Sequence, residues 1–189
     1  MKTTCVILNG PPGVGKGAIS ALMSKNFGYQ EASLKEAVFQ DVASHYDFPV
    51  EALKEIHSDR EAKEMSQPFL GGNSTREALI HVSERIIKPA KGKDWYGRLL
   101  GTALELQTGD WVLDGSGFPE EVSALSLYFD DTYIVRLHRE GFEFGTDSRS
   151  YLYDKDDNIT YLDQTLQEGM PEQGAAMIEL QIALHKEGF

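Results

Sequence analysis

A glycine-rich segment near the N-terminus combines residue types and spacings that suit phosphate binding. Residues 10–16 read GPPGVGK and match the first seven positions of the pattern G-x-x-x-x-G-K-[ST]. Gly10, Gly13 and Gly15 allow backbone angles at which successive N–H groups converge on phosphate oxygens. Lys16 adds a positive charge. The segment therefore predicts a grip on a nucleoside triphosphate, through Gly10, Pro12, Gly13, Val14, Gly15, Lys16, Gly17 and Ala18.

The eighth position departs from this pattern. Gly17 stands where a serine or threonine hydroxyl would bind Mg²⁺, and Ala18 follows it. A magnesium ion would then have to be held by phosphates, water and a carboxylate, with Ser20 as a spare hydroxyl.

Asp114 is the expected carboxylate, because it follows the apolar residues 111–113 and so ends a buried strand. In open α/β folds ligands bind at the carboxyl ends of the strands, which predicts that Asp114 holds Mg²⁺ through water. An aspartate in this place could instead only cap the next turn. Gly117 in the following GSG is expected to let a substrate approach closely. Residues 114–117 also satisfy the D-x-x-G of GTPases, but no N-K-x-D segment is present to recognise guanine, which disfavours that interpretation.

Two groups of cations could bind a phosphoryl acceptor. Arg60 and Arg76 could make bidentate contacts to an acceptor phosphate, or could belong to solvated helical ion pairs. The stretch 88–98 is the most basic in the chain, and its Lys88, Trp95 and Arg98 could bind and stack a base. The alternative for this stretch is a surface loop with solvated lysines.

Three further arginines surround a glycine-containing segment. Arg136 and Arg139 end an apolar strand, and Arg149 follows after Gly141 and Gly145. This arrangement predicts a lid, about 139–153, that brings guanidinium groups onto the transferring phosphoryl group. A long surface loop with incidental charge is the alternative. Arg136, Arg139 and Arg149 are therefore grouped with Lys16 and Asp114 as candidate catalytic residues.

The surrounding pattern predicts an α/β fold. Residues 3–9 form a short apolar run, 16–27 have helical spacing, and strand character returns at 110–114 and 132–137. Helices are expected at 34–45, 50–57, 58–65, 75–87, 95–107, 119–127 and 171–185, and a turn at 154–158. We expect about five mostly parallel strands with helices on both faces, and a helical acceptor-binding region at about 33–107.

Composition bounds the class of protein. The 189 residues carry a formal net charge of −12, which argues against a nucleic-acid partner. No apolar run approaches the roughly 20 residues that span a bilayer, and the N-terminus does not resemble a signal peptide. Cys5 is the single cysteine and is expected to be buried and inert. These features predict one domain, 1–189, in the cytoplasm, with no membrane partner; they do not indicate an oligomeric state.

Several motifs occur together in one order over about residues 4–150. They are the glycine loop, DREAKE, STREALIHVSE with IKP, DGSGFPEE, and RLHREG through DSRSYL. In this combination the chain resembles the phage-encoded deoxynucleoside monophosphate kinase-like proteins, a group similar to adenylate and thymidylate kinases. The resemblance implies a P-loop NTPase fold and transfer of the γ-phosphoryl group of ATP to a deoxynucleoside monophosphate, with Mg²⁺, in the host cytoplasm if the gene is from a phage.

The resemblance also implies roles for single residues. Lys16 becomes a phosphate ligand, Asp114 the carboxylate on the metal side, and Arg76 a contact to the acceptor phosphate. The lid cations become Arg136, Arg139 and Arg149. The change at Gly17 and Ala18 leaves open which protein atom binds the metal directly.

Two other functions stay open at this point. The same superfamily includes phage kinases that phosphorylate 5-hydroxymethyluracil in DNA, in pathways of thymine hypermodification; the basic stretch 88–98 favours that function and the acidic balance opposes it. A nucleotide-binding module without kinase activity is the second alternative. The preferred base cannot be deduced from these motifs, because several loops shape the pocket that reads it.

Overall fold

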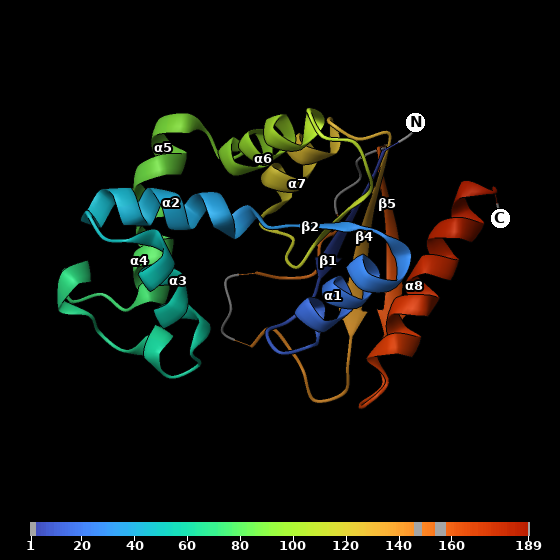
Figure 1. Ribbon diagram of the computed structural model, residues 1–189, viewed down its shortest axis with the longest axis horizontal. Coiled ribbons are helices and arrows are strands. Elements are labelled where there is room, and N and C mark those ends of the chain that lie inside the picture. The colour runs from blue at the N-terminus through green and yellow to red at the C-terminus, as the bar shows by residue number, and fades with distance from the viewer. Residues whose placement is uncertain (1–2, 146–148, 154–157, 189) are drawn as a thin grey trace.

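The computed structural model describes residues 3–145, 149–153 and 158–188. Its five strands form one sheet in the order β2-β3-β1-β4-β5, and every neighbouring pair is parallel (Figure 1). The strands are β1 (Thr4–Asn9), β2 (Gln30–Ala32), β3 (Trp111–Leu113), β4 (Asp131–His138) and β5 (Ile159–Thr165). This confirms the predicted fold class. Because all strands run the same way, β1, β3 and β4 present their carboxyl ends at one edge of the sheet.

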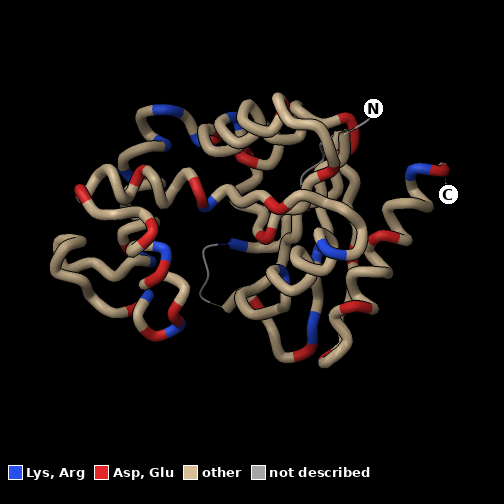
Figure 2. Tube along the Cα trace, in the orientation of Figure 1, with Lys and Arg blue, Asp and Glu red and all other residues tan. Residues whose placement is uncertain are grey.

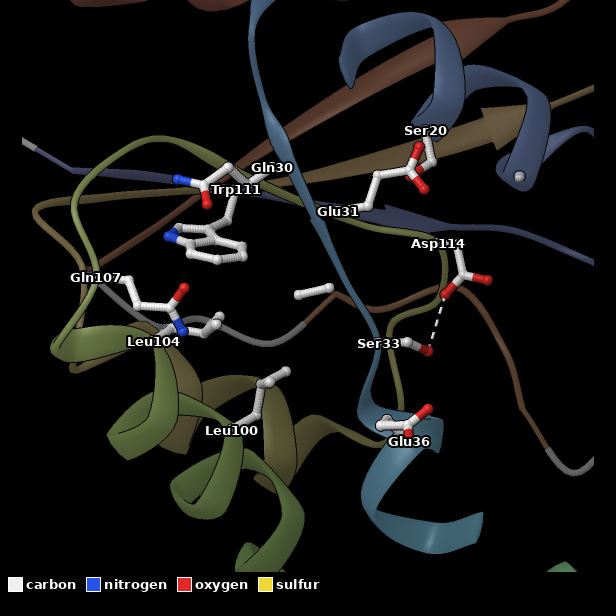
Figure 3. A pocket seen from close by; sticks show the side chains of 12 residues that line it. Ser20, Gln30, Glu31, Ser33, Glu36, Leu100, Leu104, Gln107, Trp111 and Asp114 are labelled. Carbon is white, nitrogen blue, oxygen red and sulfur yellow. Dashed lines mark hydrogen bonds between the residues drawn. The ribbon is translucent and has the colours of Figure 1, made fainter. Parts of the chain in front are cut away.

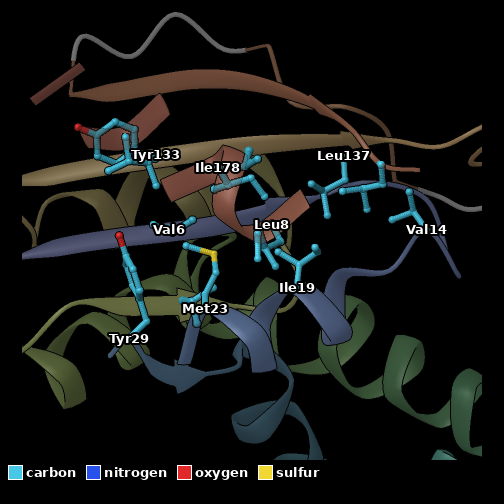
Figure 4. Close-up of a cluster of buried hydrophobic side chains, with 14 residues drawn as sticks. Val6, Leu8, Val14, Ile19, Met23, Tyr29, Tyr133, Leu137 and Ile178 are labelled. Atoms are coloured by element: carbon cyan, nitrogen blue, oxygen red, sulfur yellow. The ribbon is translucent and has the colours of Figure 1, made fainter. Parts of the chain in front are cut away.

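Two helices cover one face of the sheet. They are α1 (Lys16–Phe27) and α8 (Pro171–Lys186). Val6 and Leu8 of β1 pack against Ile19 and Met23 of α1 and Ile178 of α8, all fully buried (Figure 4). This packing holds α1 against β1, and the glycine loop, residues 10–15, connects them.

The opposite face is covered by α6 (Trp95–Glu105) and α7 (Pro119–Ser126). Cys5 and Ile7 of β1 pack there with Tyr96 and Leu125. As expected, Cys5 is completely buried, and burial raises the pKa of its thiol far above the usual range. The two helices approach so closely that a Cβ at Gly97 would overlap the carbonyl oxygen of Glu121.

The predicted helical region forms a cluster beside the sheet (Figure 1). Its elements are α2 (Leu34–Tyr46), α3 (Val50–Ser58), the short 3₁₀ helices η1 (Ala62–Glu64) and η2 (Pro68–Leu70), α4 (Thr75–Ile80), the π-helix η3 (His81–Ile87) and α5 (Lys88–Lys91). Phe39, Val42, Leu53 and Leu70 are buried in a core of its own. Among the described residues, no helix is long and apolar enough to cross a bilayer.

Some predicted elements differ. The helix expected at 58–65 is wrong, because the Asp59 carboxylate accepts the N–H groups of Glu61 and Ala62 and starts a turn that continues only as η1. Helix 75–87 is present, but its second half is π-helical. Most of the expected turn at 154–158 lies outside the described residues.

Candidate functional site

The glycine loop connects the end of β1 to the start of α1. Gly13 and Gly15 have φ angles of 79° and 120°, which a residue with a side chain would adopt only under strain. Gly15 caps α1, so the positive end of that helix faces the loop. The Lys16 ammonium folds back over the loop and donates to the carbonyl oxygens of Gly10 (2.6 Å) and Pro11 (2.8 Å). A phosphate could take the place of these carbonyls.

Asp114 follows β3, the neighbour of β1, so it reaches the same edge of the sheet as the loop. The Ser33 hydroxyl donates to its Oδ1 at 3.1 Å (Figure 3). Ser33 also caps α2, accepting the N–H of Lys35. The residue that precedes the helical region therefore contacts Asp114, the carboxylate predicted to hold Mg²⁺ through water.

The residues present fit a magnesium ion held mainly by phosphates and water. Among the described residues, no group of three His, Cys, Asp or Glu side chains could hold a metal, which leaves Asp114 with Ser33 beside it. A Cβ at Gly17 would meet nothing within 4 Å, so the missing hydroxyl is not excluded by crowding. Ser20, the spare hydroxyl, is buried and lines an open hollow beside β2, which Ser33 and Asp114 also line (Figure 3).

A cavity of about 270 Å³, hereafter the main cavity, joins the glycine loop to the helical region. Its lining comes from the glycine loop, the end of β3, the segment after β4, and the elements α2, α3, η1, α4, η3, α5, α6 and α7. Eight residues predicted for the site lie in this lining: Gly10, Pro12, Lys16, Arg76, Lys88, Asp114, Gly117 and Arg149. The volume is close to the lower end of the range for small-molecule sites.

One part of the main cavity is strongly basic. Lys16, Lys35, Lys63, Arg76 and Arg149 all line the cavity. Figure 2 shows that Lys and Arg positions occur along the chain in both the sheet and the helical region. The Arg76 guanidinium also pairs with Glu64 at 3.3 Å. In a chain with net charge −12, this concentration of cations is a local feature suited to phosphate groups.

His57 lies in this basic part. Its Nδ1 is 3.1 Å from the Thr75 hydroxyl, and its ring meets Phe39 edge-on at 5.2 Å. Burial, together with the charges of Lys35 and Lys63, lowers the pKa of His57 to about 4. The imidazole is therefore neutral at neutral pH.

The inner part of the cavity carries buried charges. Lys88 pairs with Glu84 at 2.7 Å and with Glu121 at 3.1 Å, and its ammonium lies 4.0 Å from the centroid of the Phe118 ring. Burial raises the pKa of the Glu121 carboxyl, while the charge of Lys88 opposes that shift. Lys88, assigned to the substrate from the sequence, is thus engaged with protein partners.

The other residues predicted for the site in the glycine loop and the lid do not line the main cavity. Val14 is buried in the core, and Gly17 and Ala18 are exposed on the first turn of α1. Gly13 lies against Phe142, with the Arg60 guanidinium close by. The Arg139 guanidinium lies 4.6 Å from the centroid of the Phe142 ring.

Two of the predicted lid arginines are held by carboxylates. Arg139 pairs with Glu168 at 3.4 Å. Arg136 pairs with Asp163 and lies 4.6 Å from the centroid of the Tyr153 ring. His138 Nε2 lies 2.7 Å from Oδ1 of the same aspartate. Of the three lid arginines, only Arg149 lines the main cavity.

Trp95 and Arg98 lie at the start of α6, apart from the lining of the main cavity. Arg98 pairs with Asp94 at 3.0 Å, and Lys91 lies 4.4 Å from the centroid of the Trp95 ring. The basic stretch 88–98 is therefore split between a buried lysine and surface pairs, and Trp95 and Arg98 are not part of the site proposed below.

Sequence reasoning missed several lining residues. Ser33, His57, Glu84, Phe118 and Glu121 gave no chemical motif. Two weak signals were available. Glu84 precedes Lys88 by four residues, which is helical ion-pair spacing, and Glu121 lies three residues after Phe118, the spacing of a helix cap.

Comparisons with known proteins find likeness only among solved structures. No protein-family model and no curated protein sequence matches the chain. The structures that resemble it include a gluconokinase from Sinorhizobium meliloti 1021 (13% identity, 98% of each chain covered, TM-score 0.48) and TT1252 from Thermus thermophilus (17% identity, 97% of this chain and 99% of that one covered, TM-score 0.49). They also include a shikimate kinase from Bacteroides thetaiotaomicron (10% identity, 95% of this chain and 98% of that one covered, TM-score 0.41). Likeness at this level assigns neither a reaction nor a substrate, so both have to come from the chain's own residues.

Proposed function

We propose that the chain transfers the γ-phosphoryl group of ATP to a deoxynucleoside monophosphate with Mg²⁺. One observation carries this proposal: a single cavity joins Lys16 and Asp114 to Arg76 and to an apolar pocket in the helical region. Donor grip and acceptor pocket therefore open into the same space, as phosphoryl transfer between two bound nucleotides requires.

On the donor side, the loop N–H groups and Lys16 bind the terminal phosphates of ATP. Lys16 exchanges the carbonyl oxygens of Gly10 and Pro11 for phosphate oxygens, so its charge is already held at the loop. Asp114, steadied by the Ser33 hydroxyl, would hold Mg²⁺ through water. Mg²⁺ bound there would neutralise charge on the β- and γ-phosphates.

On the acceptor side, Arg76, Lys63 and Lys35 bind the monophosphate. An oxygen of that phosphate forms the new bond to the γ-phosphorus, the bond from the γ-phosphorus to the β,γ-bridging oxygen breaks, and the electron pair leaves on ADP. Arg149 stabilises the charge on the transferring group. Neutral His57 is not required as a base, because the acceptor phosphate is already a nucleophile.

The shape and polarity of the main cavity favour a nucleotide over a sugar as the acceptor. Beyond the cations, its walls include the apolar side chains of Leu34, Val38, Leu79 and Phe118. A flat base carrying a phosphate suits this combination, because the base is buried against apolar walls while the phosphate meets the cations. A polyhydroxylated acceptor would instead need many polar partners.

Replacing Lys16 with alanine tests the proposal. Loss of one preorganised phosphate-binding charge is expected to lower kcat by about 10²-fold or more, measured as ADP formation with a deoxynucleoside monophosphate. Lys25→Ala provides the matched control, since Lys25 is exposed in the last turn of the same helix. An unchanged rate in Lys16→Ala would contradict the proposal, and ATP binding without turnover of any acceptor would support a non-catalytic module.

A further inference from the structure

Asn9 is the last residue of β1, directly before the glycine loop, and only 1% of it is exposed. Its Oδ1 accepts the backbone N–H of Leu152 at 3.0 Å, and its Nδ2 donates to the carbonyl oxygen of Ser150 at 3.3 Å. Nδ2 also donates to the hydroxyl of Ser116 at 2.9 Å. The amide therefore uses both of its polar atoms on segments that lie far from Asn9 in the sequence.

These partners require an amide at position 9. Leu152 presents a backbone donor and Ser150 a backbone acceptor, so the side chain between them must accept at one atom and donate at the other. A carboxylate would place a negative oxygen against the Ser150 carbonyl. An aliphatic side chain would remove the partner of both backbone groups, which is costly where a group is buried. Asn9 is thus matched to the backbone of residues 150–152.

Two further contacts hold the same segment at the edge of the sheet. The Tyr151 hydroxyl donates to the carbonyl oxygen of Leu137 in β4 at 2.9 Å. Leu152 is buried in the core on the face that α6 and α7 cover. The Leu137 carbonyl also borders the glycine loop, because a Cβ at Gly10 would lie 2.9 Å from its oxygen. Residues 150–152 are therefore held against the ends of β1 and β4, beside the loop that is proposed to bind ATP.

Arg149 immediately precedes this anchored segment. It lines the main cavity together with Gly10, Pro12 and Lys16. Consecutive Cα atoms are about 3.8 Å apart, so an anchor at Ser150 confines the backbone of Arg149 to within one residue of it. The bonds of Asn9 consequently restrict where the Arg149 guanidinium can reach in the cavity.

From these contacts we infer that Asn9 is a positioning residue, which holds residues 150–152 at the end of β1 and so places the Arg149 guanidinium over the transferring phosphoryl group. Asn9 is not among the residues that line the main cavity, so it acts through Arg149 rather than on a substrate. Its bond to Ser116 also links this anchor to the segment after β3, two residues beyond Asp114. This inference rests on the proposed function and adds a residue that controls its rate.

A double-mutant cycle of Asn9→Ala and Arg149→Ala tests this role. With ATP, Mg²⁺ and a deoxynucleoside monophosphate, Asn9→Ala is expected to lower kcat by about tenfold or more, because a misplacement of about 1 Å can cost on the order of 10²-fold. The KM for ATP should stay near its wild-type value. In the Arg149→Ala background, Asn9→Ala should cost little further, since the guanidinium that it positions is gone. A purely structural role would lower kcat by the same factor in both backgrounds.

Thr4→Val, at the opposite end of β1, is the matched control. Thr4 is completely buried, and its hydroxyl accepts a hydrogen bond from Lys186 at 2.7 Å. This substitution removes a hydrogen bond from the same strand without touching residues 149–153, so it should lower stability but keep kcat.

Amide hydrogen exchange provides a measurement that does not depend on activity. Exchange of the Leu152 N–H should become about tenfold faster or more in Asn9→Ala, because its acceptor is lost, and should stay unchanged in Thr4→Val. Unaltered exchange in Asn9→Ala would show that Asn9 does not anchor this segment.

Each outcome of the kinetic test decides the inference. If Asn9→Ala or Arg149→Ala keeps the wild-type kcat, or if Asn9→Ala costs as much in the Arg149→Ala background as in the wild type, the role of Asn9 is wrong while the proposed function stands. If the wild type phosphorylates no deoxynucleotide, both are wrong.

Should Asn9→Ala fail to fold by circular dichroism, Tyr151→Phe decides the matter, because it removes only the bond to the Leu137 carbonyl of the same anchor. A loss of kcat that disappears in the Arg149→Ala background would support the inference. No loss, or an equal loss in both backgrounds, would overturn it.

Discussion

Single side chains set the chemistry proposed for this site through the partners that hold them. The Lys16 ammonium rests on backbone carbonyls that a phosphate would replace, and Asp114 is fixed by a hydroxyl from the first residue before α2. Neither side chain needs a large rearrangement to reach its ligand. This is the preorganisation from which electrostatic stabilisation of a transferring phosphoryl group derives.

The pKa of His57 depends on the positive charges that surround its ring in the main cavity. Its pKa is lowered to about 4 by burial and by Lys35 and Lys63. The unfolded chain takes up this proton near pH 6.5, so the folded state loses stability from His57 as the pH falls from about 6.5 toward 4. A bound phosphate should offset the lysine charges and raise the pKa. NMR titration of the His57 ring, with and without a deoxynucleoside monophosphate, measures this; an unchanged pKa on saturation would contradict phosphate binding beside His57.

At the scale of elements, the contact between α6 and α7 positions the inner part of the cavity. Gly97 of α6 packs against the backbone of Glu121, whose carboxylate binds Lys88. Gly97→Ala is expected to destabilise the fold by about 1–3 kcal/mol, because the helices must move apart. Urea denaturation measures the change. Gly17→Ala is the matched control, since its new methyl group meets nothing within 4 Å and should leave stability equal or slightly higher; equal unfolding midpoints for the two variants would rule out this packing.

The sequence predicted those elements that have strong local signals. The strand before the glycine loop, the helix after it and the strand before Asp114 are marked by apolar residues next to a motif or an acidic strand end, and all three are present. In contrast, β2 has only three residues, Gln, Glu and Ala, and β5 mixes polar and apolar residues at the edge of the sheet. β2 and β5 are strands because they pair with β3 and β4. This pairing does not require an alternation of polar and apolar residues that sequence analysis could detect.

Sequence analysis could place those site residues that belong to a short continuous motif or to the end of an apolar strand. The loop and Asp114 could be located because their spacing along the chain is fixed. Arg76 and Arg149 line the main cavity, while Arg98, also an arginine, and Trp95 are not among its lining residues. Residue type indicates what a side chain can bind. The packing of the helical region against the sheet determines which side chains share a cavity.

For the whole molecule, charge is distributed unevenly. The net charge is −12, yet six Lys and Arg side chains line the main cavity. Outside it, Arg98, Lys93 and Arg139 pair with nearby carboxylates. Duplex DNA binds through cations that replace many condensed counterions, and the paired surface cations described here do not supply such a track. The distribution favours a free nucleotide as acceptor over a base in DNA.

The central claim is best tested by following labelled γ-phosphate from ATP in the presence of both acceptor classes. The wild-type chain would be mixed with Mg²⁺, a panel of deoxynucleoside monophosphates and duplex DNA containing 5-hydroxymethyluracil. We predict that the label appears in free deoxynucleoside diphosphates, and that Lys25→Ala behaves like the wild type while Lys16→Ala does not. Label in the DNA alone, or ATP left unconsumed with every acceptor, would contradict the account.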